Sequence, residues 1–143
     1  MNPATLSEFI NEIIIKSGIL GTDKSFIDGL TRRQVHIVME IGTNVFRHGD
    51  LADRLGVDPS TLTRSLDPLY KQGIVDRQLN PDNRREVLIQ LCDKGFAVLE
   101  EINDKMNRIS SQILEHVPDH QTEMVDTSID LLLTILKQLQ FKH

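Results

Sequence analysis

Apolar residues recur along most of this chain at the three-to-four residue spacing of amphipathic helices, interrupted by short stretches with strand-like alternation. The helical stretches open with sequence signals for helix starts, such as a capping box in which Thr31 serves the amide of Gln34 and the Gln34 side chain reaches back. A loop region over residues 18–29, rich in glycine and aspartate, follows the first helix. The pattern predicts helices over 4–20, 31–42, 47–55 and 58–72, strands over 45–46, 74–79 and 86–91, and two long helices after residue 92.

The fourth predicted helix has one apolar face and one polar face. Asp58 is a good N-cap, and Pro59 occupies the first helical position, where its missing N–H costs nothing. Gly73 is the predicted C-cap. The buried stripe is Leu62, Leu66 and Leu69, and the opposite face near the N-terminal end carries Ser60, Thr61, Thr63 and Arg64. This N-terminal end is the part that a recognition helix inserts into a major groove.

A predicted hairpin follows this helix, and its turn is polar and basic. Residues 80–85 join the two strands and include Arg84 and Arg85. The third helix, the fourth helix and this hairpin together predict a winged helix-turn-helix. The fold class is therefore mainly α, of the α+β type.

The two C-terminal helices carry wide apolar stripes, separated by a helix break at residues 117–119. The first stripe has coiled-coil-like spacing and comprises Leu99, Ile102, Met106, Ile109 and Ile113. The second comprises Val125, Ile129, Leu132, Leu136 and Leu139. Together with Phe9 and Ile13 of the first helix, these faces are too large for one chain of 143 residues to cover, although a monomeric helical core is the alternative.

The charge is unevenly distributed. The chain carries a net charge of −5, but residues 47–85 hold seven cations and six anions, so the acid lies outside the basic segment. A single cysteine, Cys92, excludes internal disulfides and indicates a reducing compartment. Neither a signal peptide nor a membrane-length apolar run is present, so we expect a cytoplasmic protein without membrane partners.

Six motifs between residues 30 and 100 resemble the winged helix-turn-helix of MarR-type (multiple antibiotic resistance regulator) transcription factors. They are Leu30-Thr31-Arg32-Arg33-Gln34, Leu51-Ala52, Thr63-Arg64, Gly73-Ile74-Val75-Asp76-Arg77, Asn80-Pro81-Asp82-Asn83-Arg84-Arg85 and Leu91-Cys92. Three positions depart from the family pattern: Asn83 replaces an aspartate in the wing, Cys92 replaces a threonine, and Pro68 interrupts the recognition helix, where we expect a bend.

The resemblance implies a division of labour along the chain. Residues 30–92 would form the DNA-binding region, and residues 1–29 with 93–143 a helical module that makes the homodimer interface. The implied DNA contacts are Ser60, Thr61, Thr63, Arg64, Arg84 and Arg85, and the implied interface residues are Phe9, Ile13, Val125, Ile129, Leu132, Leu136 and Leu139. Arg85 matches the wing arginine that enters the minor groove, and Asn83 lacks the charge to hold it in an ion pair.

Two further residues, Cys92 and His36, are candidate sensors. Cys92 could have its pKa lowered by a helix N-terminus, but a small residue in a capping position is the favoured interpretation. His36 lies where zinc-sensing relatives place a ligand, yet the two further ligand positions correspond to Ile102 and Met106, which cannot bind zinc. We therefore predict no metal site and no cofactor.

The sequence thus predicts a homodimeric, sequence-specific DNA-binding transcriptional regulator: a ligand-responsive repressor of a pseudo-palindromic operator. Its partners would be double-stranded operator DNA, a second copy of the chain and a small-molecule effector of unknown identity. No catalytic motif is present, so the chain is not expected to be an enzyme. The alternatives are a zinc-dependent sensor and a winged-helix protein-interaction module that does not bind DNA.

Overall fold

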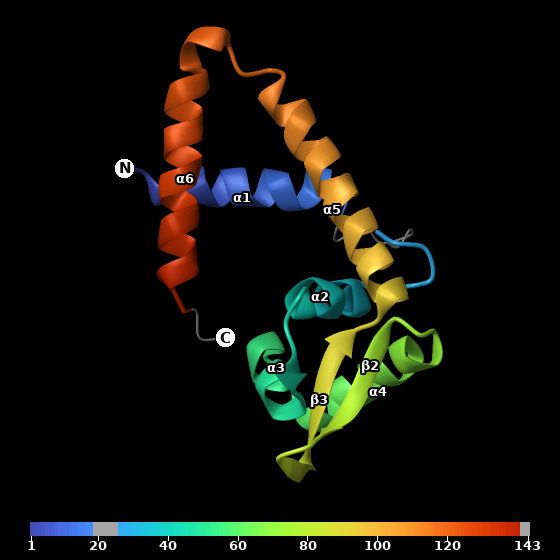
Figure 1. The fold of residues 1–143 in the computed structure, drawn as a ribbon. Helices are drawn as coiled ribbons and strands as arrows, with labels where there is room; N and C mark the ends of the chain where they lie inside the picture. Colours follow the sequence, from blue (N-terminus) through green and yellow to red (C-terminus); the bar gives the residue numbers. More distant parts are fainter. Residues whose placement is uncertain (19–25, 141–143) are drawn as a thin grey trace. The chain divides into compact units, whose positions relative to one another are not determined.

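The computed structural model describes residues 1–18 and 26–140. The chain divides into two compact units, Met1–Met106 and Asn107–His143. The secondary structure is α1 (Pro3–Ser17), α2 (Arg32–Ile41), β1 (Phe46–Arg47), α3 (His48–Leu55), α4 (Pro59–Lys71), β2 (Val75–Asn80), β3 (Asn83–Leu91), α5 (Asp93–Leu114), the short 3₁₀ helix η1 (Asp119–Gln121) and α6 (Thr122–Gln138) (Figure 1).

The helix starts and stops follow local chemistry. Thr31 and Gln34 form the predicted capping box at the start of α2, with Gln34 N–H donating to Thr31 Oγ1 at 3.2 Å and Thr31 N–H donating to Gln34 Oε1 at 3.0 Å. Helix α1 ends at Ser17 rather than at residue 20, because Gly18 adopts the left-handed conformation that ends helices. Much of the predicted loop region, residues 19–25, lies outside the described residues.

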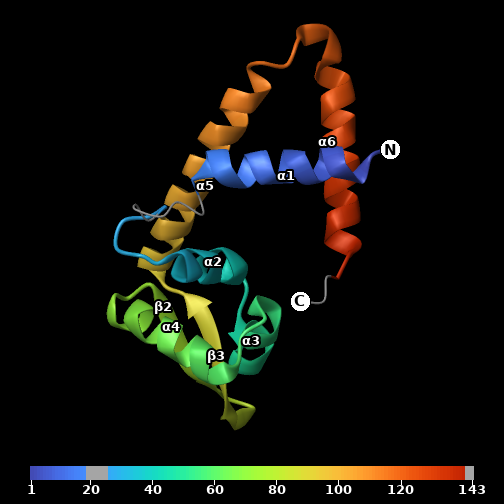
Figure 2. The ribbon, with the colours of Figure 1, turned by 180° about the vertical axis from the view of Figure 1, so that it is seen from behind.

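Strands β1, β3 and β2 form an antiparallel sheet in that order, with β3 in the centre. The short first strand pairs with the hairpin as predicted, one residue later than expected, with Phe46 opposite Ile89. Helix α4 lies against one face of this sheet, as the opposite views in Figures 1 and 2 show. The structure confirms the predicted winged helix: α3 and α4 form the helix-turn-helix, and β2 and β3 form the wing.

The end of α4 is a Schellman motif. Gln72 is the C-cap, one residue before the predicted Gly73, which follows with a φ of 72°. Gly73 N–H donates to the Tyr70 carbonyl at 3.1 Å and Ile74 N–H to the Leu69 carbonyl at 2.9 Å, the two bonds that define this motif. Pro68 lies inside the helix, which continues past it to Lys71.

The core of the first unit is aliphatic. The predicted stripe of α4 is confirmed, since Leu62, Leu66 and Leu69 have no exposed surface. The other fully buried large side chains are Ile37, Val38, Ile41, Leu51, Ile74, Ile89 and Ile102. This core holds the recognition helix against the sheet, so that the polar face of α4 is left for solvent or a partner.

Gly95 brings α5 unusually close to the start of the wing. A Cβ atom at this position would lie 2.1 Å from the Ile74 carbonyl oxygen and 3.1 Å from the Leu91 Cβ atom. Cys92 N–H donates to the same Ile74 carbonyl at 3.0 Å. Only glycine fits this approach of helix to backbone.

The apolar faces of α1 and α6 remain in solvent. Phe9 is 56% exposed, and no residue of α6 is buried. Leu139 is half exposed and forms the extended C-cap of α6, so the prediction that it continues the helical stripe was wrong by one residue. The Leu139 N–H still donates to the Ile135 carbonyl at 3.1 Å, but the backbone of Leu139 is extended, with a ψ of 139°, so the helix ends there.

Candidate nucleic-acid interface

Asp58 occupies the N-cap position of α4, but its carboxylate does not cap the backbone as expected. It instead accepts the Ser60 hydroxyl at 2.5 Å and the Thr61 hydroxyl at 2.7 Å. These two side-chain hydrogen bonds lower the pKa of Asp58 to about 2. The N-terminal end of the recognition helix therefore carries a fixed negative charge that orients its first hydroxyls.

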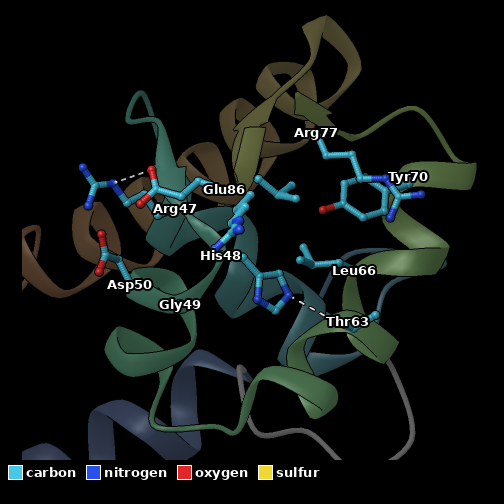
Figure 3. Close-up of a pocket in the computed structure, with 11 residues that line it drawn as sticks. Arg47, His48, Gly49, Asp50, Thr63, Leu66, Tyr70, Arg77 and Glu86 are labelled. Carbon is cyan, nitrogen blue, oxygen red and sulfur yellow. Dashed lines mark hydrogen bonds and ion pairs between the residues drawn. The ribbon is translucent and has the colours of Figure 1, made fainter. Parts of the chain in front are cut away.

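The three predicted hydroxyl contacts already use their protons inside the protein. Besides Ser60 and Thr61, Thr63 donates to the Pro59 carbonyl at 3.0 Å and lies 3.2 Å from His48 Nε2 (Figure 3). These hydroxyls therefore present oxygen lone pairs to a partner, whereas Arg64 presents donors.

Arg64 is the cation in the N-terminal half of this helix. It is exposed on α4, and among residues 1–18 and 26–140 it has no ion-pair or hydrogen-bond partner. Its guanidinium carries five donors and no acceptor. Of the four polar residues predicted on this face, Arg64 alone keeps its donors available to a partner.

The wing turn is tighter than the predicted six-residue loop. Only Pro81 and Asp82 lie between the strands, and Asn80 pairs with Asn83. Arg84 and Arg85 belong to β3 and lie in an irregularity: Leu79 pairs with Val87, so three residues of β3 separate two consecutive partners on β2. Such a bulge redirects side chains away from the regular alternation of a strand.

Asparagine side chains fix this bulge. Asn83 Oδ1 accepts the Arg85 backbone N–H at 3.1 Å, and Asn80 Oδ1 accepts the Asp82 N–H at 3.0 Å. Asn80 Nδ2 also donates to Glu86 Oε2 at 2.9 Å. Asn83 thus orients the backbone of Arg85, a role that does not need the charge of the aspartate it replaces.

A groove lies between the recognition helix and the wing, and we call it the wing groove (Figure 3). Its volume is about 560 Å³. Three arginines from three different strands, Arg47, Arg77 and Arg85, line it together with His48 and Tyr70. Arg47 forms an ion pair with Glu86 at 3.5 Å. Asp50 and Glu86 also line the groove, but a positive excess remains, carried by Arg77 and Arg85 on the wing side, where a phosphate backbone would pass.

Arg77 and Tyr70 form a stacked pair on one wall of the wing groove. The Arg77 guanidinium lies 4.6 Å from the centre of the Tyr70 ring (Figure 3). Burial of the phenol raises the pKa of Tyr70 to about 12, against the opposing effect of the Arg77 charge. No signal in the sequence marks Tyr70 as a site residue, and Arg77 stands out only as part of the strand motif Gly73-Ile74-Val75-Asp76-Arg77. Arg77 lies on β2 and Tyr70 on α4, so the residue pattern within either element does not show that the two side chains meet.

The surroundings of the two candidate sensors, Cys92 and His36, bear on their chemistry. Burial, followed by the charges of Asp76 and Asp93, raises the pKa of the Cys92 thiol, opposite to the shift that a reactive thiolate needs. Glu40, one turn from His36, is bound by Arg54 at 2.6 Å. The part of the chain described in the structure contains no cluster of three potential metal ligands. It also contains no helix long and apolar enough to cross a bilayer.

A recognition helix with an exposed polar N-terminal end, a two-stranded wing beside it and a cationic groove between them define a winged helix-turn-helix DNA-binding protein. Residues 30–87 match the family model described as "MarR family". The winged helix-turn-helix of this chain is thus similar to that of the MarR family, and the comparisons support a DNA-binding transcriptional regulator.

Known proteins similar to this chain agree with that assignment. The transcriptional regulator AdcR of Streptococcus pneumoniae is 27% identical over 101 residues, which cover 67% of this chain and 68% of that protein. The transcriptional regulator Tm0710 of Thermotoga maritima has a similar fold, with a TM-score of 0.74 at 21% identity over 95% of this chain and 94% of that one. S. pneumoniae FabT, solved in complex with DNA, has a TM-score of 0.65 at 22% identity over 97% and 96% of the two chains.

Proposed function

We propose that this chain is a homodimeric, ligand-responsive repressor that binds a pseudo-palindromic operator through α4 and the wing. The observation that carries the proposal is the wing groove, which collects arginines from β1, β2 and β3 beside the exposed end of the recognition helix. FabT, which has a similar fold, was solved in complex with DNA. A protein-interaction module that avoids DNA would not need Arg77 and Arg85 beside the recognition helix in addition to the Arg47–Glu86 ion pair.

In this proposal the predicted residues divide into two roles. Arg64 and the hydroxyls of Ser60, Thr61 and Thr63 face base edges in the major groove. Arg84 and Arg85 in the wing reach the flanking minor groove and its phosphates. Arg47 and Arg77 join the phosphate-facing set, because they line the same groove as Arg85. Phosphate contacts position the protein and base contacts give specificity.

Dimerisation would cover the exposed helical faces. Ile129, Leu132 and Leu136 on α6 are 49%, 42% and 55% exposed, and Phe9 on α1 is 56% exposed. Val125 and Ile13 are only partly covered. Apolar faces of this extent are typical of protein interfaces, and we assign them to a second copy of the chain. Residues 1–29 and 93–143 would then form the dimerisation module and residues 30–92 the DNA-binding region.

The proposed repressor would act by occupying its operator. A dimer that covers an operator overlapping a promoter excludes other proteins from that DNA, and a ligand that binds the free dimer better than the DNA complex releases it.

Footprinting tests the proposal. DNA fragments retained by the purified protein should share an inverted repeat whose half-site centres lie about one helical turn, roughly 10 bp, apart. Inserting about half a turn between the half-sites should abolish tight binding, because the two recognition helices would then face opposite sides of the duplex. A single asymmetric half-site, or tolerance of the insertion, would contradict the two-fold arrangement. Failure to retain any duplex would contradict the role of the wing groove.

A further inference from the structure

Tyr70 and Arg77 meet where the recognition helix passes into the wing. The Schellman motif at the end of α4 turns the chain into β2 within three residues, and Gly73 has the positive φ that this turn requires. Strand β2 then runs beside α4, and the Arg77 guanidinium lies over the Tyr70 ring, 4.6 Å from its centre (Figure 3). Both side chains line the wing groove, so this contact lies where the proposed function places the DNA backbone.

The contact holds Arg77 without occupying its donors. A cation–π interaction attracts the guanidinium to the face of a ring and needs no acceptor atom. Among the residues that the structure describes, the Arg77 side chain forms neither an ion pair nor a hydrogen bond. The Arg77 guanidinium is therefore held at one place in the groove while its N–H groups have no acceptor within the described protein.

Arg47, in the same groove, is held by a different kind of contact. Its Nε lies 3.5 Å from Glu86 Oε2, which also accepts the Asn80 side-chain amide. That ion pair positions Arg47 but balances its charge, so a phosphate must compete with Glu86 to bind it. The Tyr70 ring is neutral, because burial raises the pKa of its phenol to about 12. Tyr70 therefore positions Arg77 and leaves the positive charge of Arg77 available.

We propose that Tyr70 is a positioning residue for DNA binding, whose ring holds the Arg77 guanidinium in place for a phosphate of the operator backbone. Fixing a long side chain before binding reduces the conformational entropy that is lost when the complex forms. This difference corresponds to about 2- to 12-fold in affinity for each half-site. The inference rests on the proposed function, and it adds a residue that acts on DNA through Arg77.

A double-mutant cycle on Tyr70 and Arg77 tests the assignment, with the affinity of the full chain for its operator duplex measured over a salt series. Tyr70→Leu removes the ring and keeps an apolar side chain. It should weaken binding about 2- to 12-fold for each half-site and leave the salt slope unchanged, because Arg77 still reaches its phosphate. Arg77→Gln removes the phosphate contact itself and should flatten the slope of log affinity against log salt by about 1.8 for two half-sites. In the Arg77→Gln background, Tyr70→Leu should have no further effect.

Tyr70→Phe is the matched control, because it keeps the ring and removes only the hydroxyl. It should bind the duplex like the wild type. Proton NMR spectra of the full chain without DNA give an independent readout of the contact. The Arg77 side-chain protons should show a ring-current shift in the wild type and in Tyr70→Phe, and this shift should be absent in Tyr70→Leu.

The outcomes separate this inference from the proposed function. Wild-type affinity in Tyr70→Leu, or the same loss on Tyr70→Leu with and without Arg77, would overturn the positioning role. A loss of affinity in Tyr70→Phe as large as that in Tyr70→Leu would assign the effect to the hydroxyl and would also overturn it. In these cases the wild type still binds its operator, and the proposed function stands. A wild-type chain that retained no duplex would refute the proposed function, and the role of Tyr70 with it.

Discussion

Replacing Arg64 and replacing Arg85 by alanine should weaken DNA binding in different ways. Arg64 lies on the exposed face of α4, and Arg85 lines the wing groove with Arg47 and Arg77. A base contact and a phosphate contact can be separated by salt, because only phosphate neutralisation releases counterions from the duplex. The two substitutions therefore test whether the recognition helix and the wing have the roles proposed here.

The magnitudes follow from the number of contacts. A dimer loses two copies of Arg85, so the slope of log affinity against log salt should flatten by about 1.8, at about 0.9 per phosphate contact. Between about 50 and 200 mM salt, the wild-type advantage over Arg85→Ala should then shrink by about 12-fold. Arg64→Ala should cost about 1–3 kcal/mol at one position of each half-site and leave the slope unchanged if Arg64 contacts a base.

Fluorescence anisotropy with a labelled operator, repeated over a salt series and over duplexes altered at single base pairs, measures both quantities. Arg108→Ala is the matched control, because it removes a cation of α5 from outside the winged helix. If Arg64→Ala and Arg85→Ala caused equal losses with an unchanged salt slope, the assignment of base and phosphate roles would be wrong.

Three further substitutions test the fold, the wing groove and the dimer. Gly95→Ala should lower the free energy of unfolding by about 1–3 kcal/mol in urea titrations, because its Cβ would meet the Ile74 carbonyl at 2.1 Å, whereas Gly49→Ala, with open space around it, should not destabilise. Tyr70 is the only tyrosine, so phenolate absorbance measures its pKa, which burial raises to about 12. The contribution of the buried neutral phenol to the free energy of unfolding should be complete below pH 10.0 and should be lost as the pH rises through 12. Arg77→Gln should raise this pKa further, because the Arg77 charge lowers it. Leu132→Asp should abolish dimers in sedimentation experiments and unfold the helical module, while Thr134→Asp should not; a folded wild-type monomer at micromolar concentration would refute the dimer.

The elements that the sequence predicted best are those fixed by local chemistry. The capping box at Thr31, the stripe of Leu62, Leu66 and Leu69, and the short strand at Phe46 all follow from spacing within one element. The wing turn was harder, because six polar residues can form either a loop or a bulge. The side-chain bonds of Asn80 and Asn83 decide this, and they depend on the register of two strands.

The parts of the candidate site that the sequence did not predict depend on tertiary contacts. Arg47, His48 and Tyr70 lie up to 23 positions apart in the sequence and meet only when α4 packs on the sheet. Gly95 likewise looks like an ordinary helical glycine until Ile74 is placed beside it. Spacing within one element does not contain this information, since it depends on which faces the core brings together.

The carboxylate of Asp58 changes what the recognition helix can offer a base pair. Because the Ser60 and Thr61 hydroxyls donate to it, both present lone pairs outward, and Thr63 does the same by donating to the Pro59 carbonyl. In the major groove such acceptors suit the amino groups of adenine and cytosine, while Arg64 suits the acceptors of guanine. Asp58→Ala would free two hydroxyl protons and remove a negative charge from the DNA-facing end. We therefore expect this variant to bind DNA more tightly overall and to discriminate less between bases under Ser60 and Thr61. Unchanged base preference in a set of duplexes altered at single positions would show that these hydroxyls do not contact bases.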